Sequence, residues 1–511
     1  MKILIVAFYD DNFGDMLIRT CFTQLLRVVL QNLQVTAELS FLPLKSLENE
    51  VIAQADLILF PGGGLFGLSY LDFADYVETV LEIAEQNQIP VVFSSLGMNN
   101  MDAQEADDDR LARTLHRSCI RAVSVREQEE SFRRYAGEIP YPISTVCDPA
   151  VWAGYVYAGD LPPRPESAAP VVGINVVRGG LFRDNGIDWV LQDEMDYLAA
   201  LAEELERRGL ETRFFTNGQT LDSNALRFFA NESSVPPEKL ILPDTAREVV
   251  QAIARFDAVA AIRMHSSILS YALGVPSVNL VWNAKVSEFY QQIGYPERAI
   301  PAGAWSPERV ADALCQALQE RPCQAEPAVL MTLYRFLFET LGGLLEKAAA
   351  PEMFDFETVC RTLARQRVPL EEDVTDLRLK VRKGENRYVS IFSTNRRRAR
   401  TIETLKQKNK GLAQDKKALE KTVQQEKAAR KSAEQQRQKS EKALERTRLD
   451  LQMTQKKLEK SRQDLQKARQ KNEKQKRELE HLNRTLAVRI HKRLGRIKRF
   501  LLRLFRGKNK G

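Results

Sequence analysis

Short apolar runs alternate with segments of helical periodicity through residues 1–157, and the same alternation begins again at residue 171. Apolar runs of about four to eight residues indicate buried strands. A helix between consecutive strands is the crossover that parallel strands require. The sequence therefore predicts an α/β fold with two Rossmann-like domains that face each other across a cleft.

The first domain is predicted to span residues 1–157. Its helices are expected at 15–33 and 70–87, and its strands at Lys2–Phe8, Val35–Phe41, Leu57–Phe60, Val91–Ser95, Ala122–Val125 and Ser144–Val146. Proline, alanine and serine dominate residues 158–170, which predicts a linker. The second domain is then residues 171–305, and a helical segment that packs on the body follows at 306–390.

Residues 391–485 differ in character, because glycine and proline nearly vanish and leucine recurs at seven-residue intervals. The leucines are Leu405, Leu412, Leu419, Leu444, Leu451, Leu458, Leu465, Leu479 and Leu486. Such a repeat predicts a coiled coil and hence a homo-oligomer, most simply a parallel dimer. The step from Leu419 to Leu444 is not a multiple of seven, which predicts a shift in register. A single charged helix without a partner is the alternative.

Residues 486–511 are predicted to form a basic amphipathic helix. From residue 391 onward the chain carries 39 Lys/Arg and 13 Asp/Glu, so a net charge of +26 stands against −19 in residues 1–390. Among the basic residues of the tail, apolar side chains recur three or four positions apart: Ile490, Leu494, Ile497, Leu501 and Leu504. This pattern favours an anionic membrane surface as the partner, and nucleic acid is the less favoured alternative.

Several features of composition predict a cytoplasmic protein. The six cysteines show no C-x-x-C spacing, which is typical of reduced thiols in a cytosolic protein. The opening stretch MKILIVAFY is a short apolar run followed at once by Asp10 and Asp11, unlike a signal peptide. No stretch approaches the roughly 18 apolar residues of a membrane span. With the basic tail, these features predict a peripheral protein on the inner face of the plasma membrane.

Arg263 and His265 come directly after an apolar run that ends at Ile262, and Ser266 or Ser267 is the predicted N-cap of the helix that follows. Ligands of open parallel sheets bind beyond the carboxyl ends of the strands. Arginine holds anions in a bidentate fork, and histidine transfers protons near neutral pH. We therefore expect Arg263 and His265 to be catalytic. A surface arginine with a half-buried histidine is the alternative.

Other predicted strands also end in polar or glycine-rich segments. Asn12 and Asp15 stand at a helix start, where free N–H groups attract anions, although Asp15 alone fits a simple cap. Gly62, Gly63 and Gly64 predict a loop in which the backbone approaches a ligand closely. Gly62, Gly64 and Gly67 match G-x-G-x-x-G, but this match is weak as a dinucleotide signal. Further candidate binding residues, each near a strand end, are Asn99, Arg126, Asn175, Arg178, Ser266 and Lys285.

Several reaction classes lack support in the sequence. No HExxH motif, no metal-spaced Cys/His cluster, no P-loop and no G-x-S-x-G motif occurs. The sequence therefore predicts no metal site and gives no support for acyl transfer.

Seven stretches together resemble the polysaccharide pyruvyl transferase family. They are NFGDMLI, PGGGLFG, SLGMNN, SVREQEES, CDPAVW, GINVVR and RMHSSILSYALGVPSVNLVWNAKVSEFY. The resemblance covers roughly residues 1–300. Its most specific part is an R-x-H before a serine-led helix, followed by G-x-P and a lysine. The family's arginine and histidine correspond to Arg263 and His265.

The resemblance implies a two-domain fold like that of GT-B glycosyltransferases. It also implies that the enolpyruvyl group of phosphoenolpyruvate, the donor substrate, moves onto a sugar as a cyclic ketal with release of phosphate. The acceptor would be a cell-surface polysaccharide or its lipid-linked precursor, and no cofactor is implied. Two alternatives remain open: a glycosyltransferase of the same shape that uses a nucleotide sugar, and a non-catalytic scaffold that serves the coiled coil.

Overall fold

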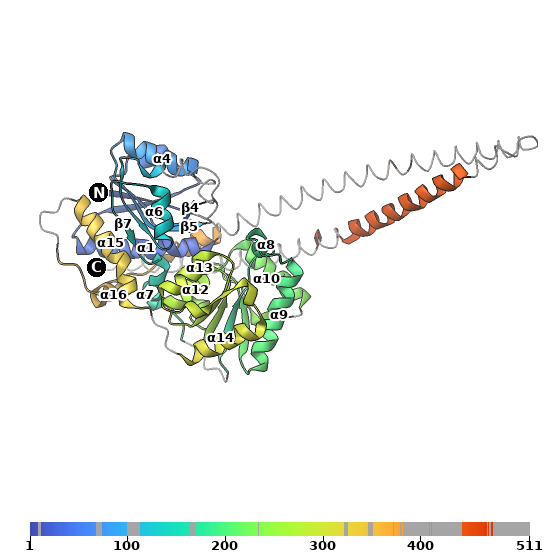
Figure 1. Cartoon of the computed structure of the whole chain (residues 1–511). Helices are drawn as coiled ribbons and strands as arrows, with labels where there is room; N and C mark the ends of the chain where they lie inside the picture. Colours follow the sequence, from blue (N-terminus) through green and yellow to red (C-terminus); the bar gives the residue numbers. More distant parts are fainter. Residues whose placement is uncertain are drawn as a thin grey trace, which may run out of the picture. The chain divides into compact units, whose positions relative to one another are not determined.

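The computed structural model describes residues 1–8, 12–67, 74–99, 113–163, 169–233, 235–320, 325–345, 351–370, 372–378, 381, 408, 410, 442–467, 469 and 472–473. The chain divides into two compact units, Met1–Lys380 and Val381–Gly511. The first unit contains two α/β lobes, coloured blue to teal and green to yellow in Figure 1.

The first lobe is built on a seven-stranded sheet whose paired strands all run parallel. The strand order is β2-β1-β3-β5-β6-β7, and β4 pairs with β5 beside this path. The strands are β1 (Lys2–Ala7), β2 (Glu38–Pro43), β3 (Leu57–Phe60), β4 (Gly63–Gly67), β5 (Val91–Asn99), β6 (Ile120–Val125) and β7 (Ile143–Thr145). The helices between them are α1 (Phe13–Asn32), α2 (Asn49–Ala53), α4 (Ala74–Gln86) and α6 (Glu129–Ala136).

Short helices connect the first lobe to the second: η1 (Pro149–Trp152), α7 (Ala153–Val156) and η2 (Ala158–Asp160). The second lobe has a six-stranded parallel sheet in the order β10-β9-β8-β11-β12-β13. Its strands are β8 (Val171–Asn175), β9 (Glu211–Phe215), β10 (Leu240–Ile241), β11 (Ala258–Ala261), β12 (Ser277–Val281) and β13 (Ala299–Pro301). The expectation of two parallel α/β domains is therefore confirmed.

The helices of the second lobe are α8 (Leu181–Asp184), α9 (Leu191–Arg207), α10 (Thr220–Glu232), α11 (Ala246–Ile253), α12 (Met264–Ala272), α13 (Ala284–Gln292) and α14 (Pro307–Gln319). Short 3₁₀ turns lie at η3 (Pro237–Lys239), η4 (Pro296–Arg298) and η5 (Ala302–Ala304). The outer face of the first sheet packs against α2, α4 and α6, and that of the second against α9, α10 and α14. Helices on both faces explain why strands such as β1 are continuously apolar.

One hydrophobic core is common to both lobes. It joins the inner faces of the two sheets through α1 of the first lobe and α11, α12 and α13 of the second. Because α1 lies against α11, and η1 against α12, the lobes pack directly on each other. The amino-terminal ends of α1 and α12 meet at this junction, where Gly14 packs against His265.

The helical segment after residue 306 is divided between the lobes. Helix α14 covers the second sheet, whereas α15 (Pro327–Leu344) and α16 (Phe356–Arg365) return to pack on α1 (Figure 1). Asn32 at the end of α1 accepts hydrogen bonds from the Tyr334 hydroxyl at 2.6 Å and from the Phe354 amide at 2.9 Å. The first lobe is thus completed by chain that follows the second.

Most expected strands of the first lobe have an end that differs from the observed one by one to three residues, and two features differ more. Strand β5 continues to Asn99, past a left-handed residue at Ser95 with φ of 48° and a shift in its register with β6. The expected glycine loop is in part strand β4, which pairs with this extension of β5. Periodicity did not predict either feature, because both depend on the neighbouring strand.

Residues 442–467 of the second unit are helical. Leu444, Leu451, Leu458 and Leu465 are half-buried on this helix, whereas Leu449, outside the heptad, is 61% exposed. The other heptad leucines and the tail at 486–511 lie outside the described residues, so the coiled coil and the amphipathic helix stay predictions. None of the helices that the structure describes is long and apolar enough to cross a membrane.

Candidate active site

The catalytic candidate His265 lies in the first turn of α12, not at a strand end. Helix α12 begins at Met264 with Arg263 as its N-cap, so the predicted caps Ser266 and Ser267 are wrong. Both serines are fully buried inside the helix. The Ser266 hydroxyl donates to Asn217 Oδ1 at 2.8 Å, and Ser267 accepts from Asn279 at 2.9 Å. These tertiary partners replace the local cap.

His265 is placed where the two lobes touch. Its ring lies against Gly14, where a Cβ atom would come within 2.3 Å of Nδ1. Nε2 is buried without a hydrogen-bond partner among the described residues, 3.8 Å from Oδ2 of Asp148. Burial lowers the pKa of His265 to about 4, and the cations Arg126, Lys285 and Arg263 act in the same direction, while Asp148 opposes them. His265 is therefore neutral near pH 7.

Arg126, Glu127 and Asp148 form a buried charged group on the first lobe, beside His265. Arg126 Nε donates to Glu127 at 2.7 Å, and its Nη1 bonds to Asp148. Burial opposes the charge of Arg126, but the two carboxylates outweigh it and raise the pKa of the guanidinium. Burial raises the pKa of Glu127, and Arg126 and Lys285 partly offset that effect. Gly97 is required here, because a Cβ would meet Arg126 Nη2 at 2.4 Å.

The ammonium of Lys285, at the start of α13, lies within the same field of charges. Its Nζ stands 5.5 Å from the centre of the Trp282 ring. Burial and then Arg126 lower the pKa of Lys285 to about 8, although Glu127 and Asp15 act against this shift. Lys285 is thus charged at neutral pH and loses its proton under mildly alkaline conditions.

Arg263 is already engaged by a carboxylate. Its Nε and Nη2 donate to both oxygens of Asp222, at 3.0 and 2.8 Å, and Nη2 also donates to Gln219 at 2.6 Å. Asp222 is completely buried. Two edges of the guanidinium are therefore occupied, and among the described residues only Nη1 makes no hydrogen bond. Arg263 can offer that one group to a ligand in this conformation, not the bidentate fork expected from sequence.

Asn175 and Arg178 lie close to Arg263, but their contacts are structural. The side chain of Asn175 is fully buried and accepts from the amides of Ile262 and Arg263, at 3.3 and 2.9 Å. It therefore joins β8 to the end of β11. The Arg178 amide donates to Asp222 at 2.8 Å, while its guanidinium pairs with Asp184 at 2.6 Å.

The remaining candidates cluster at the start of α1 and near β5. Asn12 is the N-cap of α1, accepting from the Gly14 amide at 3.2 Å, and its Nδ2 donates to Asp15 at 2.8 Å, so Asp15 is not the cap. Gly62 has a φ of 132°, and a Cβ added there would stand 3.0 Å from the Ser95 carbonyl oxygen. Gly63 begins β4, Gly64 lies within it, and Asn99 ends β5 with a side chain outside the described part of the structure.

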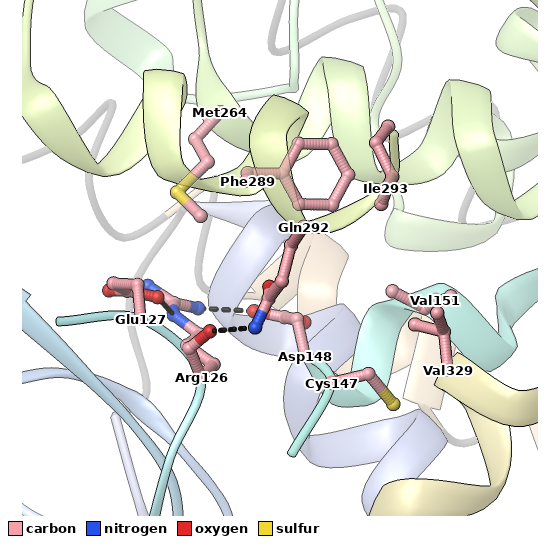
Figure 2. A pocket seen from close by; sticks show the side chains of 10 residues that line it. All are labelled: Arg126, Glu127, Cys147, Asp148, Val151, Met264, Phe289, Gln292, Ile293 and Val329. Carbon is pink, nitrogen blue, oxygen red and sulfur yellow. Dashed lines mark hydrogen bonds and ion pairs between the residues drawn. The ribbon is translucent and has the colours of Figure 1, made fainter. Parts of the chain in front are cut away.

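A narrow cavity opens beside the charged group on the junction of the lobes (Figure 2). Arg126, Glu127 and Asp148 line one side, and Met264, Phe289 and Gln292 the other. Gln292 donates to the Arg126 carbonyl at 3.0 Å, which ties α13 to the end of β6. The free space amounts to about one water molecule, so a donor of several heavy atoms does not fit in this conformation.

The sequence alone did not identify Asp148, Glu127 and Asp222 as site residues. Each is a buried carboxylate that contacts a candidate arginine, Arg126 or Arg263. A signal for Asp148 exists, since an acid directly before proline often caps a helix, and Asp148 caps η1. Glu127 directly follows Arg126 after β6, so the strand-end position that indicated Arg126 also applies to Glu127. For Asp222 we find no comparable local signal. Among the described residues, no group of His, Cys, Asp and Glu side chains is arranged to hold a metal ion.

Comparisons with known proteins agree with the resemblance of the motifs. The sequence model of the polysaccharide pyruvyl transferase family matches residues 12–283. No curated protein matches the chain. A solved structure of UDP-GlcNAc 2-epimerase from Methanocaldococcus jannaschii is 12% identical, covering 67% of this chain and 100% of its own at a TM-score of 0.45. A putative UDP-N-acetylglucosamine 2-epimerase from Listeria monocytogenes is 13% identical, covering 69% and 99% at a TM-score of 0.43.

Proposed function

Because the chain belongs to the polysaccharide pyruvyl transferase family, we propose that it transfers pyruvate from phosphoenolpyruvate to a sugar of a cell-surface polysaccharide or its lipid-linked precursor, forming a ketal. The observation that carries this proposal is the placement of His265 among three cations, Arg126, Lys285 and Arg263, at the junction of the lobes. Phosphoenolpyruvate carries a phosphate and a carboxylate, and a cluster of cations with one proton-transfer group suits such a donor.

The reaction requires a proton at the methylene carbon of the donor. When that carbon becomes a methyl group, the adjacent carbon develops oxocarbenium character and accepts two sugar hydroxyl oxygens in turn, while the phosphate leaves. One hydroxyl proton balances the proton delivered to the methylene carbon, and the other leaves with the phosphate. In this proposal His265 delivers the proton.

The charges around His265 favour protonation of its imidazole when the anionic donor binds. In the ligand-free protein, burial keeps the imidazole neutral, and the surrounding cations add to this effect. The negative charge of a bound donor offsets those cations, and an opposite charge nearby raises the pKa of a histidine. Asp148, 3.8 Å away on the other lobe, then holds the imidazolium in place. The narrow cavity implies that the lobes move apart slightly to admit the donor.

The test of catalysis is His265→Ala, measured by phosphate release from phosphoenolpyruvate with an acceptor present. We expect the turnover to fall by a factor of about 10² to 10⁴. His116→Ala is the matched control, since His116 is an exposed residue of the first lobe whose Nε2 hydrogen-bonds to the Ala136 carbonyl at 3.1 Å. Turnover of His265→Ala near that of the wild type contradicts the assigned role.

The acceptor is tested by mass spectrometry of the cell-surface glycan with and without the gene. Loss of a pyruvate ketal supports the proposal. If the glycan instead loses a whole sugar, the chain is a glycosyltransferase that uses a nucleotide sugar. An unchanged glycan together with no phosphate release favours the non-catalytic scaffold.

The location proposed is the inner face of the plasma membrane, beside lipid-linked acceptors. Residues 484–511 contain eleven Lys/Arg and no acid. Each basic residue near an anionic surface contributes about 1 kcal/mol, so such a tail binds strongly at low salt. Flotation with anionic vesicles is expected to carry the full chain and to fail with salt or without residues 486–511. Tight binding to duplex DNA without vesicle binding contradicts this location.

A further inference from the structure

Residues 366–370 and 372–378, here called the acidic strap, contact both lobes through charged side chains. On the first lobe, Arg19 of α1 pairs with Glu372. On the second, Arg247 of α11 donates from Nε to both oxygens of Asp373, at 3.3 and 3.0 Å. Its Nη2 donates to the Val368 carbonyl at 3.0 Å. The strap therefore holds one buried arginine from each lobe.

The second lobe is attached to the strap at a further point. The amide of Ala246, in the first turn of α11, donates to Asp376 Oδ2 at 2.9 Å. The end of the connection between the lobes is fixed to the same helix, because Arg247 also pairs with Asp160 and Gln251 donates to the Asp160 carbonyl at 2.8 Å. Arg247 is thus bonded to both segments that join the lobes, the linker and the strap.

These contacts lie along the path to the candidate active site. Helices α1 and α11 pack against each other, and Gly14 in the first turn of α1 lies against His265. Removing one partner of a buried ion pair leaves the other charge buried without compensation. Loss of either side chain is therefore expected to destabilise the contact between the strap and that lobe strongly. Asp148 and Gly14 belong to the first lobe, whereas His265 belongs to the second. A change in the angle between α1 and α11 therefore moves Asp148 and Gly14 relative to His265.

We propose that the acidic strap sets the relative orientation of the two lobes and thereby keeps His265 against Gly14 and Asp148. The strap acts by holding both arginines at once. Loss of either ion pair weakens the attachment of the strap to that lobe, and the strap then constrains the orientation between the lobes less. The strap ends at residue 378, directly before the second unit begins at Val381.

The test uses the full chain with Glu372→Gln, Asp373→Asn and the double substitution, followed by hydrogen exchange. The probes are the backbone amides of residues 13–16 in α1 and 264–267 in α12. Either single substitution is expected to speed exchange about tenfold in both turns, although each removes a contact to one lobe only. The double variant is expected to exchange no faster than the more severe single variant, because weakening either attachment already relaxes the constraint between the lobes.

Glu204→Gln is the matched control, since Glu204 pairs with Arg207 and Arg208 within the second lobe. It is expected to leave exchange in both turns unchanged. The proposal is overturned if exchange accelerates only in the lobe that lost its ion pair, with additive effects in the double variant. Glu372 is partly exposed, at 23%, so Glu372→Gln provides an answer even where Asp373→Asn impairs folding.

Discussion

Charge balance around individual residues governs the site. Burial and then Arg126 lower the pKa of Lys285 to about 8, while Glu127 and Asp15 oppose the shift, so Lys285 is charged at pH 7. Asp148 is near both Arg126 and His265. Its carboxylate is paired with the Arg126 guanidinium, and it stabilises the His265 imidazole only when that ring is protonated. At this scale, function depends on which groups are charged before the ligand arrives.

Donor binding is expected to weaken as the pH rises through about 8, the pKa of Lys285. Above it, each pH unit removes about nine-tenths of the remaining charged lysine, so affinity falls up to about tenfold per unit. Calorimetric titration with phosphoenolpyruvate between pH 7 and 9.5 measures this. Lys285→Met is expected to bind more weakly and to lose the dependence, whereas Lys239→Met, which alters a surface pair with Glu206, retains it.

Unfolding does not explain such a loss. The pKa of Lys285 is lower in the folded protein than in the unfolded chain, so the unfolded chain binds more protons between about 8 and the ordinary value of lysine. The contribution of Lys285 to stability therefore rises with pH across this window. A wild-type protein whose affinity stays constant from pH 7 to 9.5 contradicts a role for the Lys285 charge.

The residues of the site were only partly predictable. Arg263, His265 and Lys285 are close in sequence to strand ends, and that position is visible in the hydrophobic pattern. The carboxylates that engage the arginines come from distant segments, as Asp222 does for Arg263 and Asp148 for Arg126. No local pattern encodes such pairs, because they form only once the lobes are folded.

At the scale of elements, the start of α1 is packed so closely against His265 that a larger side chain at Gly14 does not fit. Gly14 is in the first turn, where alanine favours a helix by about 1 kcal/mol. However, the added Cβ would stand 2.3 Å from Nδ1 of His265, which is far closer than van der Waals contact. The clash outweighs the gain in helix propensity, because relieving it displaces the His265 ring or the start of α1 from the packing between the lobes.

Gly14→Ala is therefore expected to lower the free energy of unfolding by about 1–3 kcal/mol and turnover by at least about tenfold. Thermal unfolding and phosphate release measure the two effects. Gly303→Ala is the control, since a Cβ at Gly303 meets open space, and it is expected to change neither quantity. Wild-type turnover in Gly14→Ala rules out a tight contact between the lobes during catalysis.

Elements were predicted better than their ends. The helix over residues 15–33 is observed as α1 (Phe13–Asn32), because its long apolar stripe determines it. The start of α12 was missed, since Ser266 hydrogen-bonds to Asn217 of another segment in place of capping its own helix. The return of α15 to the first lobe was not predictable either, because periodicity shows that a helix has an apolar face but not which partner covers it.

For the whole molecule, the heptad leucines predict self-association. The full chain is expected to sediment as an oligomer, most simply a dimer, at micromolar concentration. The double substitution Leu451→Ser and Leu458→Ser places hydroxyls on the heptad stripe and is expected to shift the chain toward monomer. Leu449→Ser is the matched control, because Leu449 is 61% exposed on the same helix. A monomeric wild-type chain contradicts the prediction.

The return of α15 to α1 also determines the order in which the protein can be completed as it is synthesised. Tyr334 and Phe338 belong to the same core as the buried face of α1, so part of that face stays uncovered until the ribosome has passed both of them. By then the strands of the second lobe have already been translated. Part of the apolar surface of the amino-terminal half is therefore expected to stay exposed until it is covered by chain made more than three hundred residues later, and such exposed surface makes a nascent protein prone to aggregate.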